Sequence, residues 1–100
     1  MKALTPGHRY LLDDYRYNEE QNGHQILQFF HRDAGGNVLH NGTTNEEVLS
    51  MLIDRMQHLS ERVPSRESSI VITKLEECLM WLSKRTADRV ARGVEGTFKQ

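Results

Sequence analysis

The second half of the chain has the sequence pattern of two long helices joined by one short turn. Thr44-Asn45-Glu46-Glu47 has the form of a capping box, with Thr44 as the N-cap and Glu47 at the third helical position. An apolar residue then recurs every three or four positions, which is the spacing of one helical face. These residues are Val48, Leu52, Met56, Leu59 and Val63. Val63-Pro64 ends the first helix, because the residue before a proline is pushed out of the α conformation.

A second helix is expected after the proline. Ser65 is placed to cap its start, and Gly93 is the residue type that commonly follows the end of a helix. Its apolar stripe consists of Val71, Leu75, Cys78 and Leu82, with Ile72, Leu79 and Thr86 alongside. We therefore expect helices over residues 43–63 and 65–93, folded as an antiparallel hairpin, and a frayed tail over residues 94–100. Cys78, within this stripe, is expected to be a buried thiol.

Residues 7–42 have the composition of a small antiparallel sheet. The runs at residues 8–17 and 24–32 are rich in Tyr, Phe, Ile and Leu, and Asn22-Gly23 between them is a turn signal. A glycine-containing turn at residues 33–37 leads to a third short run at 38–42. We expect a hairpin or a three-stranded meander, so that the whole chain is one α+β domain. A small sheet and a lone hairpin leave apolar surface uncovered, which favours a homo-oligomer.

Composition and charge exclude several classes of function. The formal net charge of -1 gives no global basic field, which argues against binding to polymeric nucleic acid. No apolar run has the length of a membrane span, and the first ten residues lack the apolar core of a signal peptide. The single cysteine fits a reducing compartment. The chain is expected to be a soluble intracellular protein without a membrane partner.

Catalytic and metal-binding patterns are also missing from the sequence. The five histidines show no helical pair at metal-ligand spacing. The sequence also lacks a GxSxG nucleophile motif, a phosphate-binding P-loop and a cysteine–histidine signature. The glycines of residues 35–42 lack the spacing of a dinucleotide-binding loop and precede a strand. We expect no metal, no cofactor and no enzymatic activity, so that binding is the favoured class of function.

Aromatic and amide side chains provide the first candidate binding residues. Phe29 and Phe30 are adjacent on one strand, so their rings face opposite sides of the sheet. At least one belongs to the core, and the other could stack on a nucleobase for about 1–3 kcal/mol. Asn41 and Asn45 flank the start of the first helix, where free N–H groups suit phosphate and ribose oxygens. Turn and cap chemistry also explains this segment in part.

Arg62 and Arg66 flank the proline turn. Arg62 stands in the last turn of the first helix, where the helix dipole favours a cation. Arg66 stands in the first turn of the second helix, where the dipole disfavours one. An ion pair with Glu67 and a phosphate grip by both arginines are equally compatible with these residues. A further excess of three positive charges over residues 84–92 suits an ordinary solvated helix end.

Three segments give the chain a resemblance to a known family: "NGTTNEEVL", "SRESSIVITKLEE" and "KRTADRVARGVEGT". Over residues 7–97 the chain resembles phage nucleotide sponges that share a helical hairpin domain, most closely the anti-Thoeris branch and more distantly the anti-CBASS branch. The resemblance implies a dimer or hexamer in the cytoplasm of an infected bacterium. It also implies that glycocyclic ADP-ribose isomers, or in the related branch cyclic di- and trinucleotides, are bound without being degraded.

The resemblance also implies roles for particular residues. Phe30, with Phe29 as second choice, would stack on adenine in a site between subunits. Asn45 or Asn41 would bond to ribose or phosphate, while Arg62 and Arg66 would hold the pyrophosphate. The chain departs from its relatives at two positions, with Ser65 where a cysteine is expected and Cys78 where an alanine is expected. A structural oligomerisation module without a ligand is the alternative outside this class.

Overall fold

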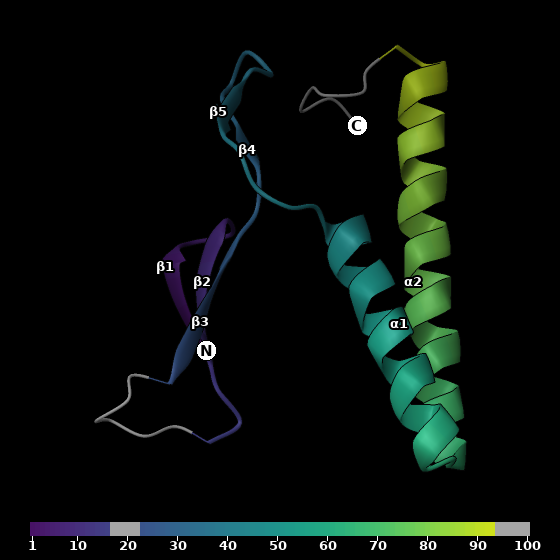
Figure 1. Cartoon of the computed structure of the whole chain (residues 1–100). Helices are drawn as coiled ribbons and strands as arrows, with labels where there is room; N and C mark the ends of the chain where they lie inside the picture. The colour runs from purple at the N-terminus through teal and green to yellow at the C-terminus, as the bar shows by residue number, and fades with distance from the viewer. Residues whose placement is uncertain (17–22, 94–100) are drawn as a thin grey trace. The chain divides into compact units, whose positions relative to one another are not determined.

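The computed structural model describes residues 1–16 and 23–93, which form five strands and then two helices (Figure 1). The elements are β1 Lys2–Thr5, β2 Arg9–Asp13, β3 His24–Gln28, β4 His31–Arg32, β5 Val38–His40, α1 Asn45–Arg62 and α2 Arg66–Ala91. The chain divides into two compact units, a strand unit of Met1–Thr43 and a helix unit of Thr44–Gln100. The expected α+β order is confirmed. Asn22 and the tail at 94–100 lie outside the described residues.

The strand unit contains a three-stranded antiparallel sheet in the order β1-β2-β3. Tyr10 on the central strand β2 pairs with Ala3 of β1 on one side and with Leu27 of β3 on the other. β1 lies before the expected sheet, which begins at residue 7. All four residues of β1 are exposed, so this edge strand lacks the alternation of apolar and polar residues that marks a half-buried strand.

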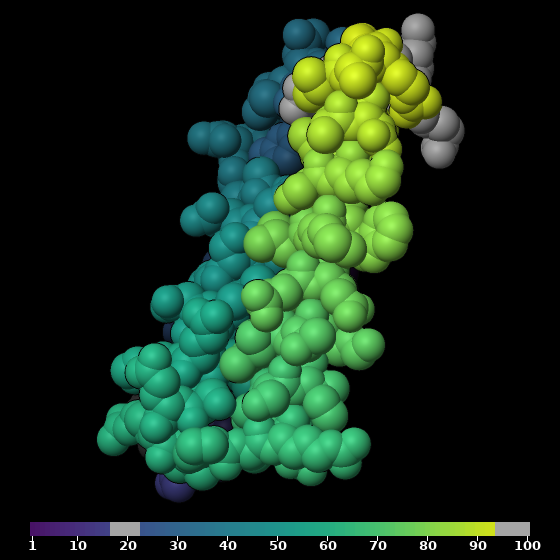
Figure 2. All heavy atoms as spheres, turned by 90° about the vertical axis from the view of Figure 1, so that its right-hand side faces the viewer, coloured from purple at the N-terminus to yellow at the C-terminus, as the bar shows by residue number. Residues whose placement is uncertain are grey.

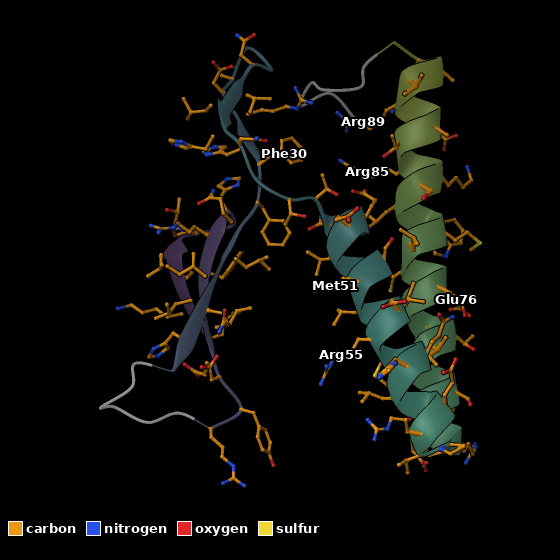
Figure 3. All side chains as sticks on the ribbon, viewed as in Figure 1. Phe30, Met51, Arg55, Glu76, Arg85 and Arg89 are labelled. Atoms are coloured by element: carbon orange, nitrogen blue, oxygen red, sulfur yellow. The ribbon has the colours of Figure 1, made fainter. Side chains whose placement is uncertain are left out.

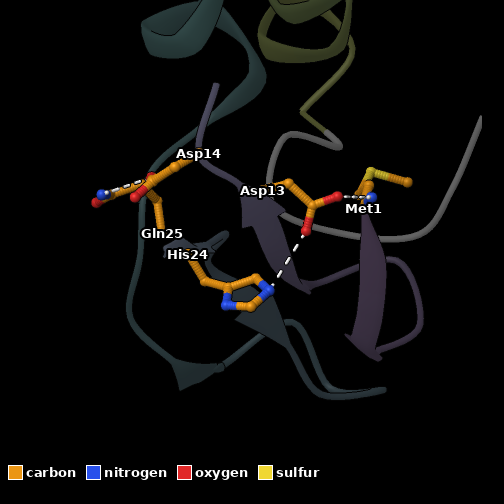
Figure 4. Close-up of polar contacts among 5 residues, drawn as sticks. All are labelled: Met1, Asp13, Asp14, His24 and Gln25. Atoms are coloured by element: carbon orange, nitrogen blue, oxygen red, sulfur yellow. Dashed lines mark hydrogen bonds and ion pairs between the residues drawn. The ribbon is translucent and has the colours of Figure 1, made fainter. Parts of the chain in front are cut away.

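Two neighbouring carboxylates hold the open end of this sheet together (Figure 4). Asp13 accepts a hydrogen bond from the Met1 ammonium group over 3.3 Å, and His24 Nε2 lies 3.4 Å from its other oxygen. Asp14 accepts a hydrogen bond of 3.1 Å from the side chain of Gln25. These contacts join the start of β1, the end of β2 and the start of β3.

A second sheet consists of the β4–β5 hairpin, whereas a single sheet, either a hairpin or a three-stranded meander, is expected from the sequence. The run at residues 24–32 is divided because Phe29 leaves the ladder and forms a parallel bridge with Thr43. Phe30 N donates to Thr43 O over 3.0 Å, and Thr43 N donates to Gln28 O over 2.9 Å. Gly42 permits this close approach of residues 42–43 to residues 28–30, since a Cβ at Gly42 would lie 2.5 Å from both Gln28 O and the Phe29 carbonyl carbon.

The helix unit begins and ends its helices at the expected signals. Thr44 Oγ1 accepts a hydrogen bond of 3.1 Å from Glu47 N at the start of α1, and Ser65 Oγ accepts one of 3.0 Å from Ser68 N at the start of α2. Gly93 follows α2 with a φ of 71°. The observed helices are shorter than the expected 43–63 and 65–93 by one or two residues at each end.

α1 and α2 lie side by side, and the C-terminal part of α2 extends beyond the start of α1 (Figure 1 and Figure 2). The half-buried positions follow alternating steps of three and four residues, as in a coiled-coil seam. On α1 these include Leu49, Ile53, Met56 and Ser60, and on α2 they include Ile72, Leu75, Leu79, Leu82 and Thr86. Two helices cover only a narrow face of each other, and accordingly neither helix contains a fully buried residue.

The expected apolar stripes are therefore confirmed only in part. Met56, Leu75 and Leu82 belong to the seam, whereas several other members of the two stripes are exposed. These are Leu52, Leu59, Val63, Val71 and Cys78. The prediction of a buried Cys78 thiol is wrong for the single chain, because the seam runs through the flanking Leu75 and Leu82. A second apolar face of the hairpin thus stays uncovered.

Candidate functional site

Arg62 and Arg66 flank the turn between the helices, with only residues 63–65 between them. Arg62 is the last residue of α1, Arg66 is the first residue of α2, and both are exposed. Within the described part of the chain neither side chain makes a hydrogen bond or an ion pair. The Arg66–Glu67 ion pair, one of the two alternatives that the sequence leaves open, is therefore not formed. The turn presents two uncompensated guanidinium groups, each able to bind a phosphate with two parallel hydrogen bonds.

The two candidate amides occupy different positions. Asn45 is the first residue of α1 and is exposed, and its side chain makes no hydrogen bond among the described residues. Asn41 belongs to the strand unit, where its Oδ1 accepts a hydrogen bond of 3.0 Å from Gly42 N. The Asn41 oxygen is therefore engaged in the turn before α1, whereas the whole Asn45 amide is available to a ligand. This difference favours Asn45.

The two candidate rings also differ in their surroundings. Phe29 packs edge-on against Tyr10 of β2, with ring centroids 6.0 Å apart and an interplanar angle of 86°. Phe30 is half-buried, and the guanidinium carbon of Arg32 lies 5.2 Å from its ring centroid. Phe29 thus contributes to the packing of the strand unit, as expected for one of the pair. Phe30 is the better candidate for a ring that receives a ligand.

A single hairpin does not gather all these residues. Asn45 and Arg62 stand at opposite ends of α1, which at 1.5 Å per residue separates them by about 25 Å. Phe29, Phe30 and Asn41 belong to the strand unit, while Asn45, Arg62 and Arg66 belong to the helix unit. The separation along α1 exceeds what one mononucleotide-sized ligand can bridge. A site that includes both Asn45 and Arg66 needs two chains.

α2 carries a second basic surface near its C-terminal end. A hollow of about 350 Å³ is lined by Trp81, Lys84, Arg85, Asp88, Arg89 and Arg92. The Trp81 residue is 61% exposed, Lys84 pairs with Asp88 over 2.9 Å, and Arg85 and Arg89 extend from the same side of the helix (Figure 3). The charge excess over residues 84–92 is expected from the sequence, whereas the Trp81 ring beside it was not among the candidate residues. The spacing of Trp81, Arg85 and Arg92 would have shown that they share a face.

The helix unit also has a groove of mixed polarity between its two helices. The groove has a volume of about 410 Å³ and is lined by Ser50, Ile53, Glu76, Leu79, Met80 and Ser83. Among the described residues, no group of three or more His, Cys, Asp or Glu side chains is arranged to hold a metal ion. In the same part of the chain, neither α1 nor α2 combines the length and apolar character needed to cross a bilayer.

Residues 16–87 match the sequence model of the family described as Acb2/Tad1, hairpin domain. This match includes α1, the turn with Arg62 and Arg66, and most of α2. The chain belongs to the Acb2/Tad1 hairpin family. Arg89 and Arg92 of the basic hollow lie beyond the matched range, whereas all six candidate binding residues lie within it. The resemblance found in the sequence is confirmed at the level of the family.

A relative of this Acb2/Tad1 hairpin chain is Thoeris anti-defense 1 of Bacillus phage SBSphiJ7. The two sequences are 51% identical over 61 residues, which is 60% of this chain and 43% of the relative. The chain thus corresponds to less than half the length of that relative. The similarity concerns a shared segment rather than the whole of either protein.

Proposed function

We propose that this chain is a phage anti-defence protein that binds and sequesters a cyclic ADP-ribose signal without degrading it. The ligands are glycocyclic ADP-ribose isomers, made by the TIR-domain enzymes of bacterial Thoeris systems. The chain acts in the cytoplasm of the infected host, needs no cofactor and keeps the signal from the immune effector. Membership of the Acb2/Tad1 hairpin family and the similarity to a Thoeris anti-defense protein support this proposal.

The observation that carries the proposal is the pair of uncompensated arginines at the helix turn. Arg66 stands at a helix N-terminus, where its charge is unfavourable, and within the described residues no carboxylate forms an ion pair with it. A pyrophosphate would supply two negative charges to Arg62 and Arg66. Binding would turn an electrostatic cost of the free protein into charge-assisted hydrogen bonds.

The family resemblance implies the other roles. Phe30 stacks on adenine, with Phe29 as second choice, and Asn45 bonds to ribose or phosphate, with Asn41 as second choice. A sponge works only if its dissociation constant lies below the signal concentration that triggers the effector. Nanomolar affinity corresponds to roughly −12 kcal/mol. A stack, phosphate contacts and burial of the ligand between preformed subunits together reach this range.

The uncovered face of the hairpin supports a homo-oligomer, either a dimer or a hexamer. Exposed apolar side chains on this unit include Leu52 and Leu59 on α1 and Val71 and Met80 on α2. Met51, 57% exposed, and Arg55 extend from the side of α1 that faces away from α2 (Figure 3). A second copy would cover such surface. An antiparallel twofold arrangement would also bring Asn45 of one chain towards Arg66 of its partner.

Cyclic di- or trinucleotides are the second candidate ligands. They carry the same two recognition elements, a purine face and phosphate groups, and the family description joins Acb2 with Tad1. The same arginines and ring would serve them. A hairpin that only assembles, without a ligand, is the remaining alternative.

Ligand release separates these functions. The protein is incubated with a glycocyclic ADP-ribose isomer, filtered, heat-denatured and filtered again, and intact ligand is measured in both filtrates. A sponge depletes the first filtrate and returns intact ligand to the second. Degraded ligand would identify an enzyme, and a ligand that is never depleted would refute the proposal for that molecule. Parallel incubations with cyclic di- and trinucleotides test the second candidate.

Arg66→Ala tests the site itself. We expect the variant to lose at least tenfold in affinity while the oligomer keeps its size, because a charge-assisted hydrogen bond is worth about 1.5–3 kcal/mol. Arg85→Ala is the matched control, since Arg85 is also an exposed helix arginine without an ion pair among the described residues and has no part in the proposed site. Dissociation of the oligomer by Arg66→Ala with unchanged capture would instead assign Arg66 a structural role.

A further inference from the structure

The turn between β4 and β5 is tightly held by its own hydrogen bonds. Asp33 Oδ1 accepts hydrogen bonds from Gly35 N over 2.9 Å and from Asn37 N over 3.0 Å. Asp33 N donates to Asn37 O over 2.8 Å, and Gly36 N donates to Asp33 O over 3.0 Å. Gly36 has a φ of 85°, a conformation that other residues rarely adopt. The position of the Gly36 carbonyl group is therefore well defined.

Arg32 is anchored to this turn by both its backbone and its side chain. Its backbone pairs with Val38 across the β4–β5 hairpin, and its Nη1 donates to Gly36 O over 2.8 Å. The same guanidinium group lies over the Phe30 ring, with Cζ 5.2 Å from the ring centroid. Among the described residues no carboxylate pairs with Arg32. The positive charge of Arg32 is stabilised by the Gly36 carbonyl dipole and by the π face of the Phe30 ring.

Arg32 makes the two faces of the Phe30 ring unequal. A cation over one face is attracted by the ring quadrupole and restricts the side chain's rotation. That face is then occupied, so a planar partner would have to stack on the opposite face of the half-buried ring. A chain of contacts that runs from Asp33 through Gly36 to Arg32 determines which face of the Phe30 ring is occupied.

We propose that Arg32 is a positioning residue, which holds the Phe30 ring and restricts base stacking to the opposite ring face. This inference rests on the proposed function, because it assigns to Arg32 a task in the same site. Arg32 acts through Phe30 and not on the phosphates. It therefore affects ligands that carry a base and leaves base-free anions unaffected, whereas Arg66 affects both.

A double-mutant cycle tests this role. The wild-type protein, Arg32→Gln, Phe30→Leu and the double variant are titrated calorimetrically with cyclic ADP-ribose and with inorganic pyrophosphate. We expect Arg32→Gln to weaken cyclic ADP-ribose binding about tenfold and to leave pyrophosphate binding unchanged. In the Phe30→Leu background the same substitution is expected to change neither. Arg32→Lys, which keeps a cation near the ring, is expected to restore part of the loss.

The outcomes separate the inference from the function on which it rests. An equal loss from Arg32→Gln in both backgrounds, or a loss of pyrophosphate binding, would show that Arg32 contacts the ligand directly and would overturn the inference. Unchanged binding by Arg32→Gln would overturn it as well. A wild-type protein that binds none of the cyclic signals would refute the proposed function instead.

The geometry has its own readout in the free protein. The ring current of Phe30 shifts the Arg32 Hε resonance upfield, and Phe30→Leu is expected to move that resonance downfield in NMR spectra. Arg9, an arginine on β2, provides the control resonance, which should stay in place. An Arg32 resonance that does not respond to Phe30→Leu would show that the guanidinium group is not held over the ring.

Discussion

Mixed oligomers of two binding-deficient variants test whether the site is shared between chains. Asn45→Ala and Arg66→Ala each remove one proposed contact from opposite ends of the helix unit. Each variant alone is expected to bind the signal poorly. When the two are denatured, mixed in equal amounts and refolded together, we expect capture to return. Some sites then receive an intact Asn45 from one chain and an intact Arg66 from the other.

The expected recovery follows from the geometry of α1. The helix places Asn45 and Arg62 about 25 Å apart, so a compact ligand cannot contact both ends of one chain. If each site draws the two residues from different chains, the Asn45 of a site is intact with a probability of one half, and so is its Arg66. About a quarter of the sites are then restored in a dimer or in a hexamer alike.

The assay is a titration of the refolded mixture with a glycocyclic ADP-ribose isomer. The number of high-affinity sites per chain is compared with that of wild-type protein refolded in the same way. Light scattering confirms that the variants and the mixture have the wild-type oligomer size. Separately refolded variants, mixed afterwards, serve as the control for subunit exchange.

Two results would refute this reasoning. A mixture with no recovered high-affinity sites, despite formation of mixed oligomers, would show that each site takes Asn45 and Arg66 from the same chain. Wild-type affinity in either variant alone would show that the substituted residue does not contact the ligand.

Three further substitutions test the fold and the assembly. Gly42→Ala is expected to destabilise the strand unit by about 3 kcal/mol, since the new Cβ would lie 2.5 Å from backbone atoms of Gln28 and Phe29. Urea unfolding measures this loss of stability. An unchanged unfolding midpoint would contradict the close approach of Gly42 to these residues. Ser65→Ala should cost about 1 kcal/mol of stability by removing the cap of α2, and thermal unfolding followed by circular dichroism detects it; a loss below a few tenths would deny the cap a role. Leu59→Asp should dissociate the oligomer in light scattering while Gln57→Asp, with the same added charge, should not; equal behaviour of the two would place the interface elsewhere.

The helix hairpin was predictable because its signals are local. The Thr44 and Ser65 caps act over three residues, and Pro64 acts on its immediate neighbour. The location of Arg62 and Arg66 at the turn followed directly from these boundaries. The family resemblance carried by the same segments is also a property of the linear sequence.

The sheet was less predictable because its pairing is not local. The run at residues 24–32 reads as one strand, yet Thr43, some fourteen positions further on, interrupts it at Phe29. The exposed edge strand β1 lacked any pattern to mark it. The strand pattern did not distinguish Phe29 from Phe30, and only the family resemblance ranked Phe30 first. In the structure their neighbours Tyr10 and Arg32 favour the same choice.

The sequence by itself therefore determined the order of the elements, the helix ends and the positions of the arginines, since each depends on residues a few positions apart. The tertiary structure decided which apolar positions form the hairpin seam, because that depends on how one helix is rotated against another. It also decided that Arg66 has no carboxylate partner in the described chain, although Glu67 is adjacent. Consecutive side chains on a helix point about 100° apart, so adjacency in sequence does not bring their charges together.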